Sequence, residues 1–402
     1  MTLMKFARIG LTIILVPIVA VAAWIIATWP KESVDGARTM DGVASAARHL
    51  TWSPDGRQLA GALQDGSYML WDAATGAVVR ELRGPYRGAG GVGLTFGPGG
   101  THVIVEQTKR TMAPNGYFSV LGAWNVADGT VTDIFGPSSA RSYSSTADRL
   151  LVLYERGEVI AYDPRTWQPA QLWKADLLAT RSLAAQPGGK LIAVSGTMMC
   201  PRGLPPARVW VYDADNIPPM PFVAIPVTTL DGPHHDGVSI QFSWLGKDKL
   251  VSTASQVGTG MNCEGRSSNL SDSDRLAIWQ AQDGKKLGAL PAAIASVESL
   301  STRPDGKMLA LAAVASDGDL TAVHVWDVEA GRLATTWGGV GAVYSGVAFS
   351  PDGKFLAASR TRESPMYRRL APIVGVFGEG ALRRLASYFS PIPEVVVAPT
   401  PN

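Results

Sequence analysis

The residues best suited to chemistry in this 402-residue sequence are two cysteines and a short histidine-containing segment. Cys200 and Cys263 are the only cysteines, and an even count in a domain outside the cytoplasm favours a disulfide. The alternative is two free thiols that lie too far apart for the Cα separation of a disulfide. We predict the Cys200–Cys263 disulfide.

The segment His234-His235-Asp236 has the side chains of a first-row metal site. No third imidazole is close in sequence, and adjacent residues rarely converge on one ion. We therefore expect a structural role, with no metal and no other cofactor.

Catalytic motifs are absent from the sequence. There is no Gly-x-Ser-x-Gly elbow, no His-Glu-x-x-His, and no phosphate-binding glycine loop at a strand-to-helix junction. The glycine-rich run at residues 90–93 lies between expected strands and has the composition of a turn. We name no catalytic residue.

Internal repetition indicates the elements that would position these residues. Residues 50–82, LTWSPDGRQLAGALQDGSYMLWDAATGAVVREL, contain four short apolar segments separated by turns rich in Asp and Gly. Such turn residues set the backbone angles that a tight turn needs, and the apolar segments have strand composition. One unit therefore predicts four antiparallel strands.

Two columns of this unit recur seven times in the same order. After Ser53-Pro54-Asp55-Gly56, the first turn recurs at residues 97–100, 145–148, 186–189, 245–248, 303–306 and 350–353. The third strand ends at Trp71-Asp72, Trp124-Asn125, Tyr162-Asp163, Tyr212-Asp213, Trp279-Gln280, Trp326-Asp327 and Phe377-Gly378. We expect these aromatic residues to pack between neighbouring units rather than to bind a ligand.

The segments LTWSPDGRQLA, VAFSPDGKFLAAS and VHVWDVEAGRLATTW resemble WD-repeat blades. The resemblance implies an all-β, seven-bladed β-propeller over residues 46–389. Nearly every unit lacks the Gly-His element of that family, so its histidine network is not expected. Either residues 38–44 or residues 381–388 could supply the outer strand of the last blade, and residues 390–402 are expected to form a Pro-rich extended tail.

The first 45 residues predict a membrane anchor and a linker. Residues 10–29, GLTIILVPIVAVAAWIIATW, carry no charge and would span roughly 30 Å as a transmembrane helix. Lys5 and Arg8 precede this span without acids, which predicts a cytoplasmic N-terminus over residues 1–9. Residues 30–45 would be a linker, and the propeller would lie outside the cytoplasm, in the periplasm of a bacterium.

A cleaved signal peptide is the alternative reading of the N-terminal segment, because Ala20-Val21-Ala22 resembles a cleavage site. Cleavage there would leave an apolar start, and the uncharged run is longer than a usual signal core. We therefore expect an uncleaved signal anchor at the cell membrane. A lipoprotein is excluded, since the first cysteine is Cys200.

Four insertions lie between the second and third strands of their blades, at residues 108–116, 197–207, 256–274 and 360–371. In a repeat array this connection always emerges on one face. We expect a basic binding face there, formed by Lys109, Arg110, Arg202, Arg208, Arg360, Arg362, Tyr367, Arg368 and Arg369. We also expect the anchor to enter the propeller on this face, near anionic lipid or a membrane partner.

These patterns favour a membrane-anchored scaffold that binds a protein or another ligand through its long loops. The alternative is a propeller enzyme, hydrolase or dehydrogenase-like, with residues collected around the central channel. The net charge of +2 is nearly neutral for this length, so nucleic acid is not expected as a partner.

Overall fold

The computed structural model describes residues 36–82, 93–110, 117–134, 136, 140–175, 179–197, 207–216, 226–230, 238–256, 276–290, 294–315, 321–338, 342–362 and 392–401. The chain divides into two units between Val34 and Asp35. The predicted span at residues 10–29 lies outside the described ranges. Within those ranges, no helix is long and apolar enough to cross a membrane.

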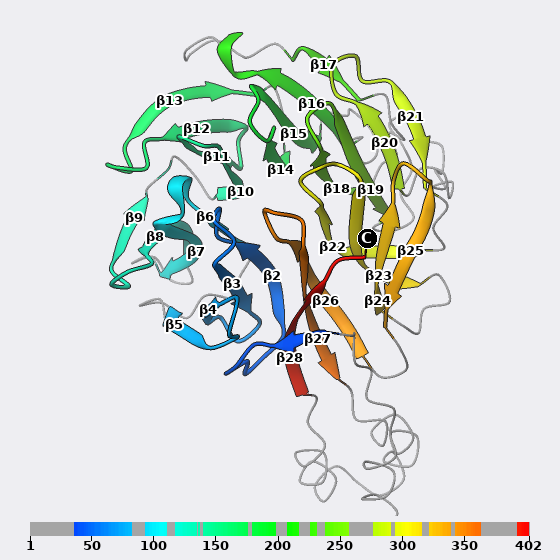
Figure 1. Cartoon of the computed structure of the whole chain (residues 1–402). Helices are drawn as coiled ribbons and strands as arrows, with labels where there is room; N and C mark the ends of the chain where they lie inside the picture. The colour runs from blue at the N-terminus through cyan, green and yellow to red at the C-terminus, as the bar shows by residue number, and fades with distance from the viewer. Residues whose placement is uncertain are drawn as a thin grey trace, which may run out of the picture. The chain divides into compact units, whose positions relative to one another are not determined.

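The described residues form seven four-stranded antiparallel sheets, which are the blades of a propeller (Figure 1). From the innermost strand outward, blades 1 to 4 are β2 (Ala47–Trp52), β3 (Gln58–Leu63), β4 (Tyr68–Asp72), β5 (Val78–Leu82); β6 (Leu94–Phe96), β7 (His102–Arg110), β8 (Tyr117–Asn125), β9 (Val131–Ile134); β10 (Ala140–Ser145), β11 (Leu150–Tyr154), β12 (Glu158–Tyr162), β13 (Pro169–Lys174); and β14 (Ala179–Ala185), β15 (Leu191–Thr197), β16 (Ala207–Asp213), β17 (Thr228–Thr229). Blades 5 to 7 are β18 (Val238–Leu245), β19 (Lys249–Gln256), β20 (Leu276–Gln280), β21 (Lys286–Ala289); β22 (Ile294–Thr302), β23 (Met308–Ala315), β24 (Thr321–Asp327), β25 (Arg332–Trp337); and β26 (Ala342–Phe349), β27 (Phe355–Arg362), β28 (Ile392–Pro399), β1 (Arg38–Thr39).

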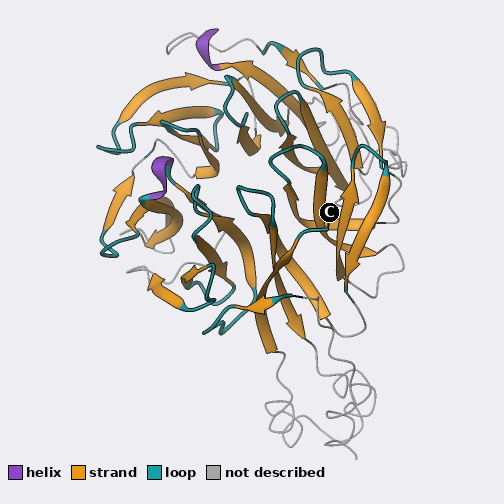
Figure 2. Ribbon diagram, in the orientation of Figure 1, coloured by secondary structure: helices purple, strands orange, loops and turns teal. Residues whose placement is uncertain are grey.

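The blades form a closed ring because each innermost strand contacts the innermost strand of the next blade, and β26 returns to β2. Figure 2 shows strands and turns throughout, with two short 3-10 helices, η1 (Pro98–Gly100) and η2 (Ala214–Asn216). The sequence-based expectation of an all-β, seven-bladed propeller is confirmed.

The aromatic column ends the third strand in six blades and is buried in all of them: Trp71, Trp124, Tyr162, Tyr212, Trp279 and Trp326. Each ring lies opposite an aliphatic residue of the second strand, as Leu59 lies opposite Trp71. These residues pack within the core, as their type and position predicted. In blade 7, Leu356 instead lies opposite Ala398.

The end of blade 7 differs from the sequence-based expectation. Residues 390–402 do not form an extended tail, because residues 392–399 are β28 and pair along the whole of β27. Phe377-Gly378 therefore does not end the third strand, and it lies outside the described residues, as does the segment 381–388. The outer strand is β1, which comes from the expected linker and pairs Arg38 with Val397. The propeller thus begins before residue 46, and its last strand ends at Pro399.

Side chains fasten this closing strand to blade 1. Arg38 donates from Nη1 to the Ala73 carbonyl (2.9 Å) and also to that of Ala74, and its guanidinium lies 5.4 Å from the centre of the Phe355 ring. The Trp71 indole donates to the Asp41 carbonyl (2.8 Å). Arg38 therefore contacts both blade 1 and blade 7, and with the Trp71 bond it closes the seam between the first and last blades.

The two ends of the ring differ in their connections. We call the end with the turns between first and second strands and between third and fourth strands the turn face. The opposite end, with the connections between second and third strands and between blades, is the connection face. The four insertions predicted from the sequence leave from the connection face. Figure 1 is a view of the turn face, where η1 and the C-terminus lie toward the viewer.

The N-terminal segment joins the propeller at the turn face, contrary to the sequence-based expectation. Gly36 lies against Pro399, at the end of β28, and the chain crosses to the connection face only at Ala46, whose carbonyl accepts from the Gln64 amide. The reason is that residues 38–39 supply an outer strand, whereas the expectation assumed direct entry into the first inner strand.

Hydrogen bonds between neighbouring inner strands hold the blades together. The amides of Leu183 and Ala185 donate to the hydroxyls of Ser142 and Ser144, and the amides of Val347 and Phe349 donate to those of Ser299 and Ser301. Other bonds of this kind run from Ser145 to the Phe96 carbonyl, from Trp244 to that of Ala184, from Thr302 to that of Trp244, from Trp52 to that of Ala348, and from Ser345 to that of Ala47. Blades 1 and 2 are joined farther from the channel, where the Tyr68 hydroxyl in the third strand of blade 1 donates to the Glu106 carbonyl in the second strand of blade 2 (2.5 Å).

We predict that Ser359→Ala lowers the free energy of unfolding by about 1–3 kcal/mol, because it leaves a buried amide without an acceptor. Ser359 is fully buried in β27, and its hydroxyl accepts from the Ala47 amide at 2.8 Å across the seam. Chemical denaturation and hydrogen exchange of the Ala47 amide measure the effect. Ser67→Ala, which removes an exposed bond to Asp65, is the control and should cost less than about 0.5 kcal/mol. Equal effects of the two variants would contradict the role assigned to Ser359.

Candidate binding surface at the channel mouth

Four of the nine residues of the predicted basic face lie outside the described residues: Arg202, Tyr367, Arg368 and Arg369. Both cysteines and His234-His235-Asp236 are outside as well. Lys109, Arg110 and Arg362 end strands β7 and β27 at this face, but their side chains are not described. The disulfide therefore stays a prediction. Within the described ranges, no group of His, Cys, Asp and Glu residues could hold a metal ion.

Arg360 is not an exposed binding residue. It is 5% exposed, and its Nε donates to the Glu394 carboxylate of β28 at 2.8 Å. Burial by itself lowers the pKa of Arg360, but the hydrogen bonds and charges of Tyr344 and Glu394 outweigh burial and raise it. Arg360 therefore joins β27 to β28 as a buried ion pair.

Arg208 begins the third strand of blade 4 at the connection face and is partly buried. Its Nε is buried without a hydrogen-bond partner. Arg208 therefore lies on the predicted face, although part of its guanidinium is withdrawn from the surface.

Five inner strands contain a β-bulge at the same place. The extra residue lies four positions (blade 3) or five positions (the other four) before the first turn of the blade and near the connection face: Arg48, Arg141, Arg181, Glu298 and Ser345. A bulge adds one residue to one strand and redirects its side chain. Because the inner strands border the channel, these bulges place their residues at the channel mouth.

Three of the five bulge residues are arginines, and they occupy blades 1, 3 and 4. Arg48 is exposed and forms no ion pair with any residue in the described ranges. Arg141 is 45% exposed and contacts Glu155 at 2.6 Å. Glu298, also exposed, lies on the other side of the ring in blade 6. The Arg181 side chain is not described, but its backbone has the same bulge.

His49 follows Arg48 in the inner strand of blade 1. Its pKa is lowered by desolvation and by the charge of Arg48. The residue keeps exposed surface, yet its surroundings exclude enough water to disfavour the charged imidazole. At neutral pH, the positive charge at this mouth therefore comes from the arginines.

Arg48, Arg141 and Arg181 were not predicted from the sequence as site residues, because the predicted basic face consists of residues in or next to the insertions. A signal was present: the three arginines lie four or five residues before the first turn of their blades. Of these three arginines, Arg48 stands before a Ser-Pro-Asp-Gly turn, whereas Arg141 and Arg181 stand before turns of other sequence. Their shared position becomes visible only when the weak repeats are aligned with the strong one.

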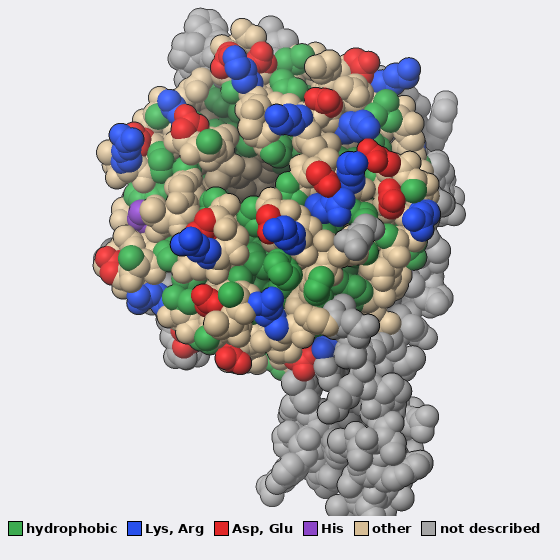
Figure 3. Space-filling view, viewed as in Figure 1, with side chains coloured by type: hydrophobic (Ala, Val, Ile, Leu, Met, Phe, Trp, Pro, Cys, Tyr) green, Lys and Arg blue, Asp and Glu red, His purple; other side chains and the backbone are tan. Residues whose placement is uncertain are grey.

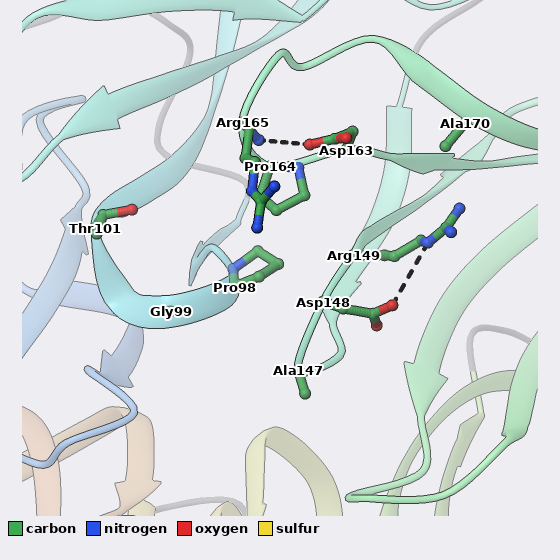
Figure 4. Close-up of a pocket in the computed structure, with 10 residues that line it drawn as sticks. All are labelled: Pro98, Gly99, Thr101, Ala147, Asp148, Arg149, Asp163, Pro164, Arg165 and Ala170. Atoms are coloured by element: carbon green, nitrogen blue, oxygen red, sulfur yellow. Dashed lines mark hydrogen bonds and ion pairs between the residues drawn. The ribbon is translucent and has the colours of Figure 1, made fainter.

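The turn face carries a groove of about 430 Å³ between blades 2 and 3 (Figure 4). The Arg165 side chain points toward Pro98 across it, as Figure 4 shows. Asp163 accepts a bond from the Arg165 amide (2.8 Å), and Asp148 lies 3.6 Å from Arg149. The charged groups of this groove interact mainly with their sequence neighbours, so we assign no ligand to it.

Trp167 lies in the turn after Asp163 and has a left-handed backbone, with φ of 55°. Gly76, Gly129, Gly284 and Gly331 occupy the same position in four other blades, four residues after the end of the third strand. The Trp167 ring is buried at 7% exposure and packs edge-on against His102, 5.1 Å between ring centres. Packing between blades 2 and 3 thus holds a residue where glycine is favoured.

Comparisons with known proteins support the fold. Residues 37–72 match the family model "WD domain, G-beta repeat", a range that covers β1 to β4. No curated protein matches the sequence. A solved structure described as "Structure of U3-55K" is 13% identical, with a TM-score of 0.59, and covers 92% of this chain and 99% of its own. At this identity, the likeness shows the fold alone.

We predict that Trp167→Gly is more stable than Trp167→Ala by about 1 kcal/mol, because only glycine adopts a left-handed backbone without cost. Both variants should lose about 3–5 kcal/mol of stability through the lost packing. Trp173, 1% exposed in β13, provides the matched control: there the alanine variant should be the more stable. Thermal and chemical denaturation of the four variants measure the two differences. The same order at both sites would show that the backbone at Trp167 carries no strain.

We predict that Arg360→Ala lowers the free energy of unfolding by about 3 kcal/mol, because it leaves the Glu394 carboxylate buried without its partner. Arg57→Ala is the control, since Arg57 is 86% exposed and should cost less than about 0.5 kcal/mol. Denaturant titration measures both. An Arg360→Ala variant with the same free energy of unfolding as wild type would contradict the stabilising role assigned to the Arg360–Glu394 ion pair.

Proposed function

We propose that this WD-repeat propeller is a non-catalytic interaction scaffold that binds an acidic segment of a protein partner at the channel mouth of its connection face. The observation that carries the proposal is the column of bulge arginines at Arg48, Arg141 and Arg181. Each comes from a different blade, so their common place at the mouth is a property of the fold rather than of one loop.

The geometry suits recognition of carboxylates. A guanidinium presents planar, paired donors that match a carboxylate, and it stays charged at all physiological pH values. The inner strands that carry the arginines are fixed by bonds between blades, so ligand binding costs little conformational entropy of the backbone. Glu298 on the opposite side favours a segment that also carries a basic group, which sets a direction across the channel.

The proposal includes a tether. Residues 10–29 are long and apolar enough to hold the chain in a membrane, and the flanking charges favour a propeller outside the cytoplasm. This part of the proposal rests on the sequence. We propose a scaffold rather than the alternative of a propeller enzyme because the bulge arginines supply a specific binding surface.

We predict that the double variant Arg48→Ser/Arg141→Ser binds a fluorescein-labelled hexaglutamate peptide at least about tenfold more weakly than wild type, equivalent to about 1.4 kcal/mol. Fluorescence anisotropy with the full-length protein measures the affinity. Binding by the wild type should also weaken as salt is raised, because the contacts are ionic.

The control is Arg57→Ser/Arg149→Ser, which removes the same charge from the turn face. It should bind the peptide like wild type. Equal losses in the two double variants would refute a specific site at the channel mouth. Affinity capture from membranes, compared across the three proteins by mass spectrometry, then identifies partners that depend on Arg48 and Arg141.

A further inference from the structure

The residue that follows the bulge in blade 1 departs from a pattern shared by the other bulged blades. In those four blades the residue is small and is a serine three times: Ser142, Ser182, Ser299 and Gly346. In blade 1 it is His49, which follows Arg48. The inner strand of blade 1 therefore carries an imidazole directly after an exposed arginine at the channel mouth.

Serine at this position holds the next blade in place. The hydroxyls of Ser142 and Ser299 accept hydrogen bonds from amides of the following inner strands, at 2.9 Å and 3.2 Å. Each of those amides lies three residues before the first turn of its blade, and the equivalent amide of blade 2 is that of Leu94. His49 does not bond to this amide, and its ring forms no hydrogen bond or ion pair with any other residue in the described ranges. Both ring nitrogens can therefore bond to a ligand without breaking a contact of the described strands.

Strand pairing turns the His49 side chain away from the face that Ala47 buries. Ala47 pairs with Leu63, and His49 pairs with Ala62, the preceding residue of β3. Because consecutive strand residues point to opposite faces, the side chains of Ala47 and His49 lie on opposite faces of the sheet. Ala47 is fully buried, whereas His49 keeps exposed surface beside Arg48.

The imidazole of His49 is mostly neutral at pH 7 in the free protein. Desolvation lowers the pKa of His49 most, and the charge of Arg48 lowers it further. Of the strands packed against β2, neither β3 nor β6 has a titratable side chain, and β26 has only Tyr344, which is buried. On β27, Arg360 is paired with an acid of β28, and the side chain of Arg362 is not described. Among the described groups, burial and one neighbouring cation therefore keep the proton off His49.

Basic side chains at the turn face are arranged differently. Arg57, Arg149 and Lys354 each lie near an acidic neighbour, at 3.9 Å, 3.6 Å and 3.7 Å. Figure 3 shows basic and acidic side chains interspersed around a central recess on this face. Mixed charge of this kind attracts an anion only weakly. An acidic segment is therefore drawn to the opposite end of the channel, where Arg48 has no acidic partner in the described ranges.

We propose that His49 binds a carboxylate of the partner segment together with Arg48, and that this binding draws a proton from solvent onto the imidazole. The inference rests on the proposed function, which assigns an acidic segment to this mouth. A carboxylate bound to Arg48 offsets the charge that disfavours the imidazolium and adds an opposite charge beside it. The protonated ring then donates an N–H to the carboxylate, so that ligand and proton stabilise each other.

We predict that the affinity for hexaglutamate rises at least about threefold from pH 8 to pH 6. The complex holds a proton over a pH range in which the free protein does not, so lowering the pH through that range favours binding. The peptide carboxylates, with a usual pKa of about 4.3, stay ionised throughout. Isothermal titration calorimetry of the full-length protein at pH 6.5 in MES and in imidazole buffer, at equal ionic strength, measures the protons taken up. We expect about 0.3–1 proton per bound peptide.

His49→Ser is the test variant, because it installs the residue that blades 3, 4 and 6 carry at this position and so fits the fold. It should bind within about twofold of wild type at pH 8, lose the pH dependence, and take up less than about 0.1 proton. The control is His324→Gln in β24, the third strand of blade 6, because burial lowers the pKa of His324 as well. This control should take up protons like wild type.

The outcomes separate this inference from the proposed function. Wild-type protein that binds hexaglutamate without taking up a proton overturns the inference and leaves the proposed function intact. Absence of binding at both pH values overturns both. Equal proton uptake in wild type and His49→Ser, or loss of uptake in His324→Gln, means that the proton is bound elsewhere and overturns the role of His49.

Discussion

The ring depends on hydrogen bonds that cross from one inner strand to the next. Packing of aromatic and aliphatic side chains between blades stabilises the ring but tolerates small displacements of one blade along its neighbour. A hydroxyl bonded to one particular amide fixes the relative position of the two blades. Ser142 with Ser144, and Ser299 with Ser301, bond alternate amides of the following blade and so define how far each blade is displaced against its neighbour. In this chain the hydroxyls provide the fixed polar contacts that a histidine network would otherwise supply.

The fold could be predicted where each blade carries its own local pattern. The turn at Ser53 to Gly56 and the aromatic residue at Trp71 are set by neighbouring residues, so six of the seven third strands are readable from the sequence. Blade 7 is not, because Ala398 stands at the aromatic position and prolines flank the apolar core of β28. Pairing with β27 makes a strand of a segment whose composition is typical of a tail.

The channel mouth could be predicted only in part. Topology placed the long insertions on one face correctly, but charge counting selected Arg360, which the fold buries against Glu394. The sequence does not distinguish a buried arginine from an exposed one. Arg360 is buried because β27 pairs with β28, a segment more than thirty residues away. The bulges that expose Arg48 and Arg141 are likewise a property of strand pairing, which no short window of sequence records.

Closing the ring with β1 also sets an order of assembly. Arg38 pairs with Val397, and the strands of blades 1 to 6 are synthesised between these two residues. As a chain emerges from its N-terminus, blades 1 to 6 can form in turn, while the segment that holds Arg38 must wait with its own edge unpaired. The final blade is therefore completed only after β28 has been synthesised. A chain that stops short of β28 would leave β27 with an open edge and β1 without a partner, so the ring cannot close until both of its distant segments are present.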